Sequence, residues 1–129
     1  MNNHLTSILI DIIKHKHQRY NTCGDWFRDG EFLRIRVSQM LNPDYEFLIA
    51  LHELVETYLS GKHGITEEEV DAFDINWKGE GEPGDCPEAP YYKEHRIATL
   101  IEKAMAETLG VDWTEYGNAI DKLDKEVAD

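Results

Sequence analysis

Hydrophobic and polar residues alternate along the first third of the chain in a way that is typical of strands. Residues 7–13 (SILIDII) are rich in β-branched side chains, and we expect a strand there, with a short helix as the alternative. Residues 33–38 (LRIRVS) alternate strictly, which predicts a strand with one solvated face. Asp29-Gly30 precedes that strand and is a strong signal for a two-residue hairpin of type I′. The pattern therefore predicts a small antiparallel sheet, made of an N-terminal strand plus a β-hairpin.

The remainder of the chain has the spacing of amphipathic helices. Asn42 before Pro43 is a helix start, and Thr66 with Glu69 forms a capping box for the next helix. Glycines and further capping patterns mark the other boundaries. We expect four helices, at about residues 42–60, 66–77, 90–110 and 112–127. The sequence thus predicts an α+β fold, with a small sheet packed against four helices, in a single domain over residues 1–129.

The first predicted helix carries a His-Glu-x-x-Glu motif, from His52 to Glu56. On a helical wheel these two residues are neighbours one turn apart, and apolar residues flank them on both sides. Glu53 projects toward the more polar side. Asp74 lies at the edge of the apolar stripe of the second helix, and His95 borders that of the third. A buried carboxylate or imidazole must be paired, hydrogen-bonded or metal-bound.

These positions predict a metal site with His52 and Glu56 as ligands and a third ligand from His95 or Asp74. The imidazoles favour zinc. Three protein ligands leave one position for water, whose pKa zinc lowers toward about 7, and Glu53 is the candidate general base. That arrangement would support metal-assisted hydrolysis.

Two other interpretations do without this metal site. His52 pairs with Glu56 or Asp74, and His95 with Glu102, as ion pairs with no metal. A metal site at His15 and His17, on one side of an extended segment, is a further alternative.

The order of strand, hairpin strand and a helix with H-E-x-x-E resembles the zincin metallopeptidases over about residues 31–60. In that family H-E-x-x-H supplies two histidine ligands and a glutamate base. The resemblance implies that His52 is a ligand and Glu53 the base. Glu56 stands where the family has its second histidine, which departs from the family signature. It also implies a zincin-like arrangement of sheet and helices.

Over nearly its full length the chain also resembles a group of short phage and prophage proteins. The segments "HELVE", "EEVDAFD", "GEPGD", "APYYKEH" and "LGVDW" carry this likeness. It implies a phage-related setting and adds a hint that His52, Glu56, Asp74 and His95 form one site. A non-catalytic phage-related protein-interaction module with a structural metal is therefore an alternative. A closed site with all four ligands would favour it, because no position remains for water.

A third class, the all-α nucleotide pyrophosphatases of the MazG type, holds magnesium with E-x-x-E and E-x-x-D pairs on facing helices. Glu53 and Glu56 resemble the first pair, and Asp71 with Glu68 or with Asp74 resembles the second. Magnesium prefers such oxygen ligands. A helical N-terminal region would favour this alternative, and strands there would disfavour it.

Charge limits the classes of partner. The 129 residues carry a formal net charge of −13, so nucleic acid and anionic membrane surfaces are not expected partners.

Cys23 and Cys86 form no C-x-x-C motif, and no signal peptide or membrane span is recognisable, so we expect a cytoplasmic protein with free thiols. No motif identifies a small-molecule, peptide or protein partner, and the oligomeric state stays open.

Overall fold

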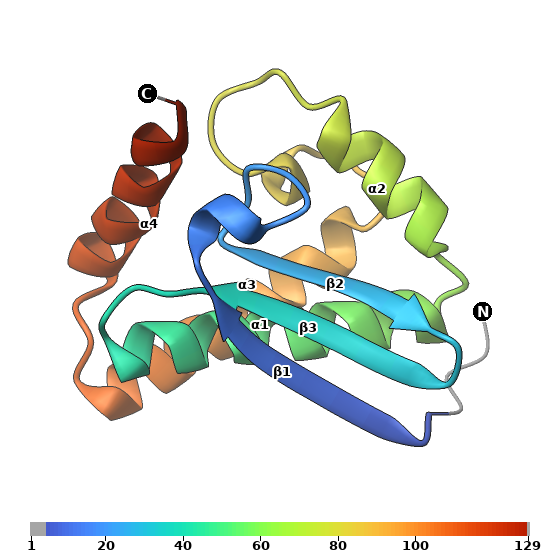
Figure 1. Cartoon of the computed structure of the whole chain (residues 1–129), viewed down its shortest axis with the longest axis horizontal. Helices are drawn as coiled ribbons and strands as arrows, with labels where there is room; N and C mark the ends of the chain where they lie inside the picture. Colours follow the sequence, from blue (N-terminus) through green and yellow to red (C-terminus); the bar gives the residue numbers. More distant parts are fainter. Residues whose placement is uncertain (1–4, 129) are drawn as a thin grey trace.

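A computed structural model describes residues 5–128 and has an α+β fold. The strands are β1 (Ser7–Ile13), β2 (Gly24–Asp29) and β3 (Phe32–Ser38). The α-helices are α1 (Pro43–Lys62), α2 (Glu67–Ile75), α3 (Tyr92–Leu109) and α4 (Trp113–Ala128). Two short 3₁₀ turns, η1 (His15–His17) and η2 (Pro83–Asp85), lie in the connections. The predicted fold class and the four predicted helices are confirmed (Figure 1).

The sheet is mixed, which corrects the expectation of an antiparallel sheet. Its strand order is β1-β3-β2. β2 and β3 form the antiparallel hairpin, but β1 pairs with β3 in parallel. The connection through η1 carries the chain from one end of β1 back to the free side of β3, so that β2 takes that side and β1 forms the opposite edge. Sequence periodicity identifies strands but does not give their relative direction.

The hairpin turn lies one residue later than expected. Asp29 pairs with Phe32, so the two loop residues are Gly30 and Glu31. Gly30 has φ of 62°, whereas Glu31 is not among the residues with positive φ. A type I′ turn needs positive φ at both central residues, so that turn type was a wrong prediction. Glycine at the first loop position supplies the one positive φ that is needed.

Local signals in the sequence explain where the helices begin. The side chain of Asn42 accepts hydrogen bonds from the backbone N–H groups of Asp44 and Tyr45, which caps α1. Thr66 and Glu69 form the predicted capping box of α2. α3 ends before Gly110, whose left-handed φ of 72° stops the helix.

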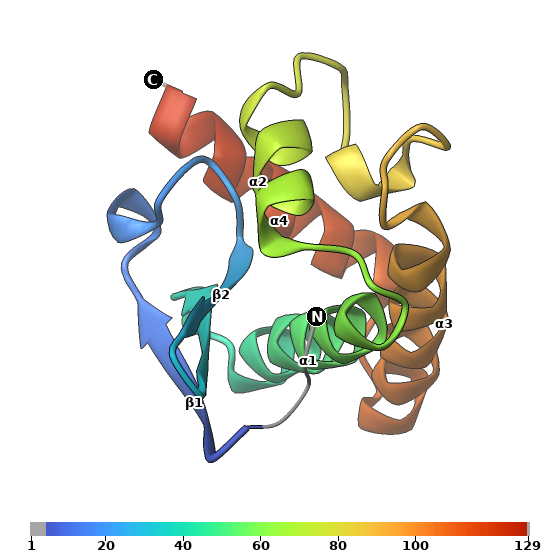
Figure 2. The same ribbon diagram turned by 90° about the vertical axis from the view of Figure 1, so that its right-hand side faces the viewer.

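The core lies between the sheet and the helices. One face of β3 is completely buried against α1, through Leu33, Ile35 and Val37. Figure 2 shows the sheet on one side of α1 and α3 on the other, so α1 is the middle layer. Residues of β2, β3 and all four helices contribute to the buried cluster. In the described part of the chain, no helix is long and apolar enough to cross a membrane.

Candidate metal centre

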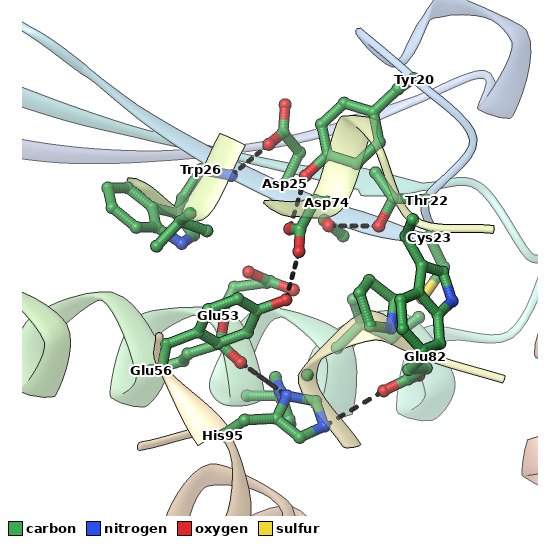
Figure 3. A pocket seen from close by; sticks show the side chains of 18 of the residues that line it. Tyr20, Thr22, Cys23, Asp25, Trp26, Glu53, Glu56, Asp74, Glu82 and His95 are labelled. Atoms are coloured by element: carbon green, nitrogen blue, oxygen red, sulfur yellow. Dashed lines mark hydrogen bonds and ion pairs between the residues drawn. The ribbon is translucent and has the colours of Figure 1, made fainter. Parts of the chain in front are cut away.

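The cavity between β2, α1, α2 and α3 has a volume of about 460 Å³. The five residues singled out from the sequence all line it: His52, Glu53, Glu56, Asp74 and His95. They come from α1, α2 and α3. Figure 3 shows Glu56 and His95 on one side of it and Asp74 with Tyr20 on the other. The tertiary structure therefore gathers the predicted residues around one space.

Three of these residues converge on a single point. Nε2 of His52 lies 2.9 Å from Oε2 of Glu56 and 3.1 Å from Nδ1 of His95. Nδ1 of His95 lies 2.8 Å from the same Glu56 oxygen. All three side chains are buried. A tetrahedral zinc ion with ligand bonds of about 2.0–2.1 Å separates its ligand atoms by about 3.3–3.4 Å, so shifts of a few tenths of an ångström would accommodate one.

The outer nitrogen of each histidine faces an acceptor. Nδ1 of His52 lies 2.7 Å from Oε1 of Glu102, whose other oxygen accepts a 2.6 Å hydrogen bond from the Tyr116 hydroxyl. Nε2 of His95 lies 3.0 Å from Oδ1 of Asp85, at the end of η2, and 3.4 Å from Oε2 of Glu82. Ionised carboxylates only accept hydrogen bonds, so both outer nitrogens carry protons. In the neutral imidazoles, Nε2 of His52 and Nδ1 of His95 are the inner nitrogens. Each then carries a lone pair, which points at the other histidine and at Glu56.

The two inner nitrogens and the Glu56 oxygen are three acceptors that face one another in a buried place, so they require positive charge between them. Without a metal, protons on the two histidines provide this charge. Burial lowers the pKa of His52, but hydrogen bonds to Glu102 and Glu56 outweigh burial and raise it to about 11. The pKa of His95 rises to about 10 in the same way, against burial, through Glu56 and Glu82. Burial opposes ionisation of Glu56, yet its bonds to the two histidines hold its pKa below the usual value.

Glu53 lines the cavity beside this group and is not one of the converging ligands. Its carboxylate lies against Gly24 of β2: a Cβ on residue 24 would lie 2.8 Å from Oε1 of Glu53 and 2.7 Å from Cγ2 of Ile49. Gly24 thus lets β2 approach α1 closely and leaves room for this side chain. Burial and the negative charge of Glu56 raise the pKa of Glu53 well above its usual value.

Asp74 occupies the opposite wall and has other partners. Its carboxylate accepts a short hydrogen bond from the Tyr91 hydroxyl and a 3.0 Å bond from that of Tyr20. Burial raises the pKa of Asp74 to about 6, although these two bonds act in the opposite direction. Among the described residues, Asp74 is not part of a group whose ligand atoms converge.

Several of the pairings expected from the sequence differ in the structure. Glu102 pairs with His52 and not with His95, because α1 and α3 pack side by side and bring residue 52 opposite residue 102. His15 is in a 3₁₀ turn and not in an extended segment. Its two ring nitrogens lie 2.7 Å from Ser38 Oγ and 2.9 Å from Asn21 Oδ1, so they are engaged locally.

Sequence reasoning missed several residues that surround the candidate centre: Tyr116, Asp85 and Gly84. Gly84 lies flat against the His95 ring, where a Cβ would come within 2.4 Å of Nδ1. The "GEPGD" segment contains Gly84 and Asp85 but gives no local indication of which helix it contacts. Glu102 was named from the sequence, because it follows His95 by two helical turns on the same face of the helix, but as a partner of His95 and not of His52.

Comparison of the chain with protein-family models, with curated proteins and with solved structures finds no match. The chemical interpretation of the site therefore depends on its geometry.

Proposed function

We propose that this protein binds one divalent zinc ion through His52, Glu56 and His95 and is a metal-dependent hydrolase. The observation that carries the proposal is the convergence of two imidazole nitrogens and one carboxylate oxygen in a buried group. One dication would replace the two protons that the histidines otherwise hold. Nitrogen donors with one carboxylate suit zinc better than magnesium or calcium.

The surroundings of the two histidines also support a metal. Histidine ligands of metals characteristically donate their second ring N–H to a carboxylate, which fixes the tautomer and the ring orientation. His52 has Glu102 in this role, and His95 has Asp85. Tyr116 in turn holds Glu102.

Catalysis is favoured over a purely structural metal because, among the described residues, the group formed by His52, Glu56 and His95 has three converging ligands. With three protein ligands, zinc keeps a position for water and lowers the pKa of that water to about 7. Glu53 is the residue that we assign as the proton acceptor. It lines the same cavity, and burial together with the negative charge of Glu56 raises its pKa above the usual range, so its carboxylate binds a proton more readily than an exposed glutamate does. Asp74 would be the fourth ligand of a closed site, but its oxygens bond to Tyr20 and Tyr91.

Two alternative functions are proposed beside the hydrolase. A non-catalytic, phage-related interaction module would use the same three ligands for a structural metal. A MazG-type magnesium pyrophosphatase is disfavoured by the strands in the N-terminal region and because Asp71 is paired with Arg19. A zincin-like arrangement and a cytoplasmic location remain parts of the proposal.

Metal content is the first test. The protein is purified without a histidine tag, and bound metals are quantified by elemental mass spectrometry in wild type, His52→Ala and the control His17→Ala. His17 is exposed in η1 and does not line the cavity. We expect about one zinc per chain in wild type and in the control, and none in His52→Ala. A folded wild-type protein that binds no added zinc would contradict the proposal and leave the charge-paired network.

The catalytic part needs a separate test. Glu53→Gln keeps the three ligands, so we expect it to bind zinc as wild type does. Against a library of peptides, esters and amides, its zinc-dependent hydrolysis should fall about 100-fold or more. Zinc binding with no hydrolysis by wild type would favour the structural-metal alternative.

A further inference from the structure

Strand β1 forms an edge of the sheet, and no element of the described chain lies beyond it (Figure 1). Within the described residues, its backbone pairs on one side only, with β3. The carbonyl of Ile13 accepts a hydrogen bond from Gln39 on that side. Because alternate residues of a strand direct their backbone groups to opposite sides, Ile8, Ile10 and Ile12 direct theirs to the open side. The edge therefore presents unpaired donors and acceptors.

The side chains of these isoleucines lie on the face of the sheet that is buried elsewhere. In the strand register, Ile8, Ile10 and Ile12 stand beside the three core residues of β3. Those core residues are at most 3% exposed, whereas the isoleucines are 47%, 47% and 50% exposed. α1 covers β3 but leaves β1 uncovered. An apolar strip thus continues from the core to the edge of the molecule.

This edge has none of the features that keep sheet edges from pairing. Proteins usually protect an edge strand with lysine, proline, a bulge or a covering element. β1 (SILIDII) contains no lysine and no proline, and its register with β3 is unbroken over all seven pairs. Its one charged residue, Asp11, is paired with Arg34 at 3.0 Å. The open edge of β1 is therefore suited to pairing with another strand.

The charge distribution indicates which partner can approach. The whole chain has a net charge of −13, so two copies repel each other over most orientations. Residues 1–41, however, contain six of the 13 Lys and Arg residues and four of the 26 Asp and Glu residues. This part, which includes the sheet, carries a small positive charge. Two copies meet with the least repulsion through the sheet.

We propose that β1 is a dimerisation strand, which pairs antiparallel with β1 of a second copy about a two-fold axis at Ile10. This register places Ile10 opposite Ile10 and Ile8 opposite Ile12, and the groups that face each other are the unpaired ones. It forms about six backbone hydrogen bonds and joins two three-stranded sheets into one. A register centred on Asp11 would place two like charges opposite each other, which is unfavourable.

The dimer does not depend on the metal site, because β1 takes no part in lining that cavity. The same interface is isologous, so it closes at two copies and does not continue into a fibre. An interface of this kind gives a discrete dimer and not an aggregate.

The test is sedimentation velocity of the protein as purified, from about 1 µM to about 300 µM, a range that covers weak to moderate self-association. Ile10→Lys places a charge at the two-fold axis. Leu100→Lys is the matched control, since Leu100 is 61% exposed on α3, away from the sheet. We expect wild type and Leu100→Lys to dimerise, and Ile10→Lys to have an association constant at least about 100-fold lower.

A second measurement uses wild type alone and does not depend on the variant folding. In a dimer, the amides of Ile8, Ile10 and Ile12 exchange with solvent at least about 100-fold more slowly at high than at low protein concentration. A wild type that stays monomeric, a dimer that survives Ile10→Lys, or a dimer that Leu100→Lys also breaks would each overturn the proposal. A monomer would mean that any strand that pairs with this edge comes from a different protein.

Discussion

At the scale of single residues, the outer nitrogens of the two histidines determine what the inner nitrogens do. Glu102 fixes the proton of His52 on Nδ1, and Asp85 fixes that of His95 on Nε2. Each imidazole is thereby held in the tautomer whose lone pair points at Glu56. The ligand group therefore depends on residues that never touch the ion.

Glu102→Gln tests this dependence. A glutamine amide both donates and accepts, so it no longer fixes the tautomer of His52. We expect the zinc dissociation constant to rise about 10- to 100-fold, measured by competition with a chelating dye. Glu107→Gln, on the exposed side of the same helix, is the control and should bind as wild type does. Equal affinity in Glu102→Gln and wild type would contradict this role.

Asp74 gives a prediction about stability and pH. Its pKa rises from 3.8 to about 6 because of burial, and the charges of Glu56 and Asp71 add to that rise, while the hydroxyls of Tyr91 and Tyr20 oppose it. The folded state therefore binds the proton more tightly than the unfolded state. The ionised group costs stability, and this cost appears as the pH rises from about 4 to about 6. Above that range the cost is complete.

Asp74→Asn removes the ionisation. We expect this variant to be about 1–2 kcal/mol more stable than wild type at pH 7.5, after allowance for solvent screening, and the difference to shrink at pH 4. Urea unfolding at the two pH values measures it, with the exposed Asp121→Asn as control. The variant should also keep its zinc. Loss of zinc would show that Asp74 is a ligand after all.

At the scale of elements, the turn η2 acts as a support for the ring of His95. It places Asp85 on Nε2 and the backbone of Gly84 against the ring face. α1 and α3 supply the ligands, but this turn limits how the His95 ring can rotate.

Gly84→Ala should therefore weaken metal binding. A Cβ on residue 84 would lie 2.4 Å from Nδ1 of His95, so the turn or the ring must move. We expect zinc affinity to fall about tenfold or more, measured by the same competition assay. Gly117→Ala in α4 is the control, because a Cβ on Gly117 would meet nothing within 4 Å. This control should bind zinc normally and be about 0.5–1 kcal/mol more stable. Normal affinity in Gly84→Ala would mean that η2 tolerates displacement.

At the scale of the whole molecule, the candidate centre connects elements that are far apart in the sequence. His52 is in α1, His95 and Glu102 are in α3, and Tyr116 is in α4. A ligand that binds only the native arrangement stabilises it in proportion to the logarithm of ligand concentration over Kd.

Removal of zinc should lower the unfolding temperature of the whole protein. At a zinc concentration about 100 times Kd, the loss is about 2.7 kcal/mol, or roughly 10 °C for a chain of this size. Scanning calorimetry with and without EDTA measures it, and added zinc should restore the original value. His52→Ala should show no response to EDTA. A wild type that EDTA leaves unchanged would argue against a metal in the native protein.

The sequence by itself determined the elements and the chemical character of the site. The capping signals at Asn42 and Thr66 and the alternation in residues 33–38 are local, because a helix end or an exposed strand face is decided by near neighbours. His52 and Glu56 are one turn apart on one helix, so their contact was also local.

Only the tertiary structure decided which residues meet across elements. The parallel pairing of β1, the contact of His52 with Glu102 and the position of Gly84 on His95 all join residues of different elements, which local patterns do not relate. Helix packing selects these partners, and a helical wheel shows which face is buried but not which residue lies opposite. The same packing left β1 without a covering helix, and this exposed edge is what we propose a second copy covers.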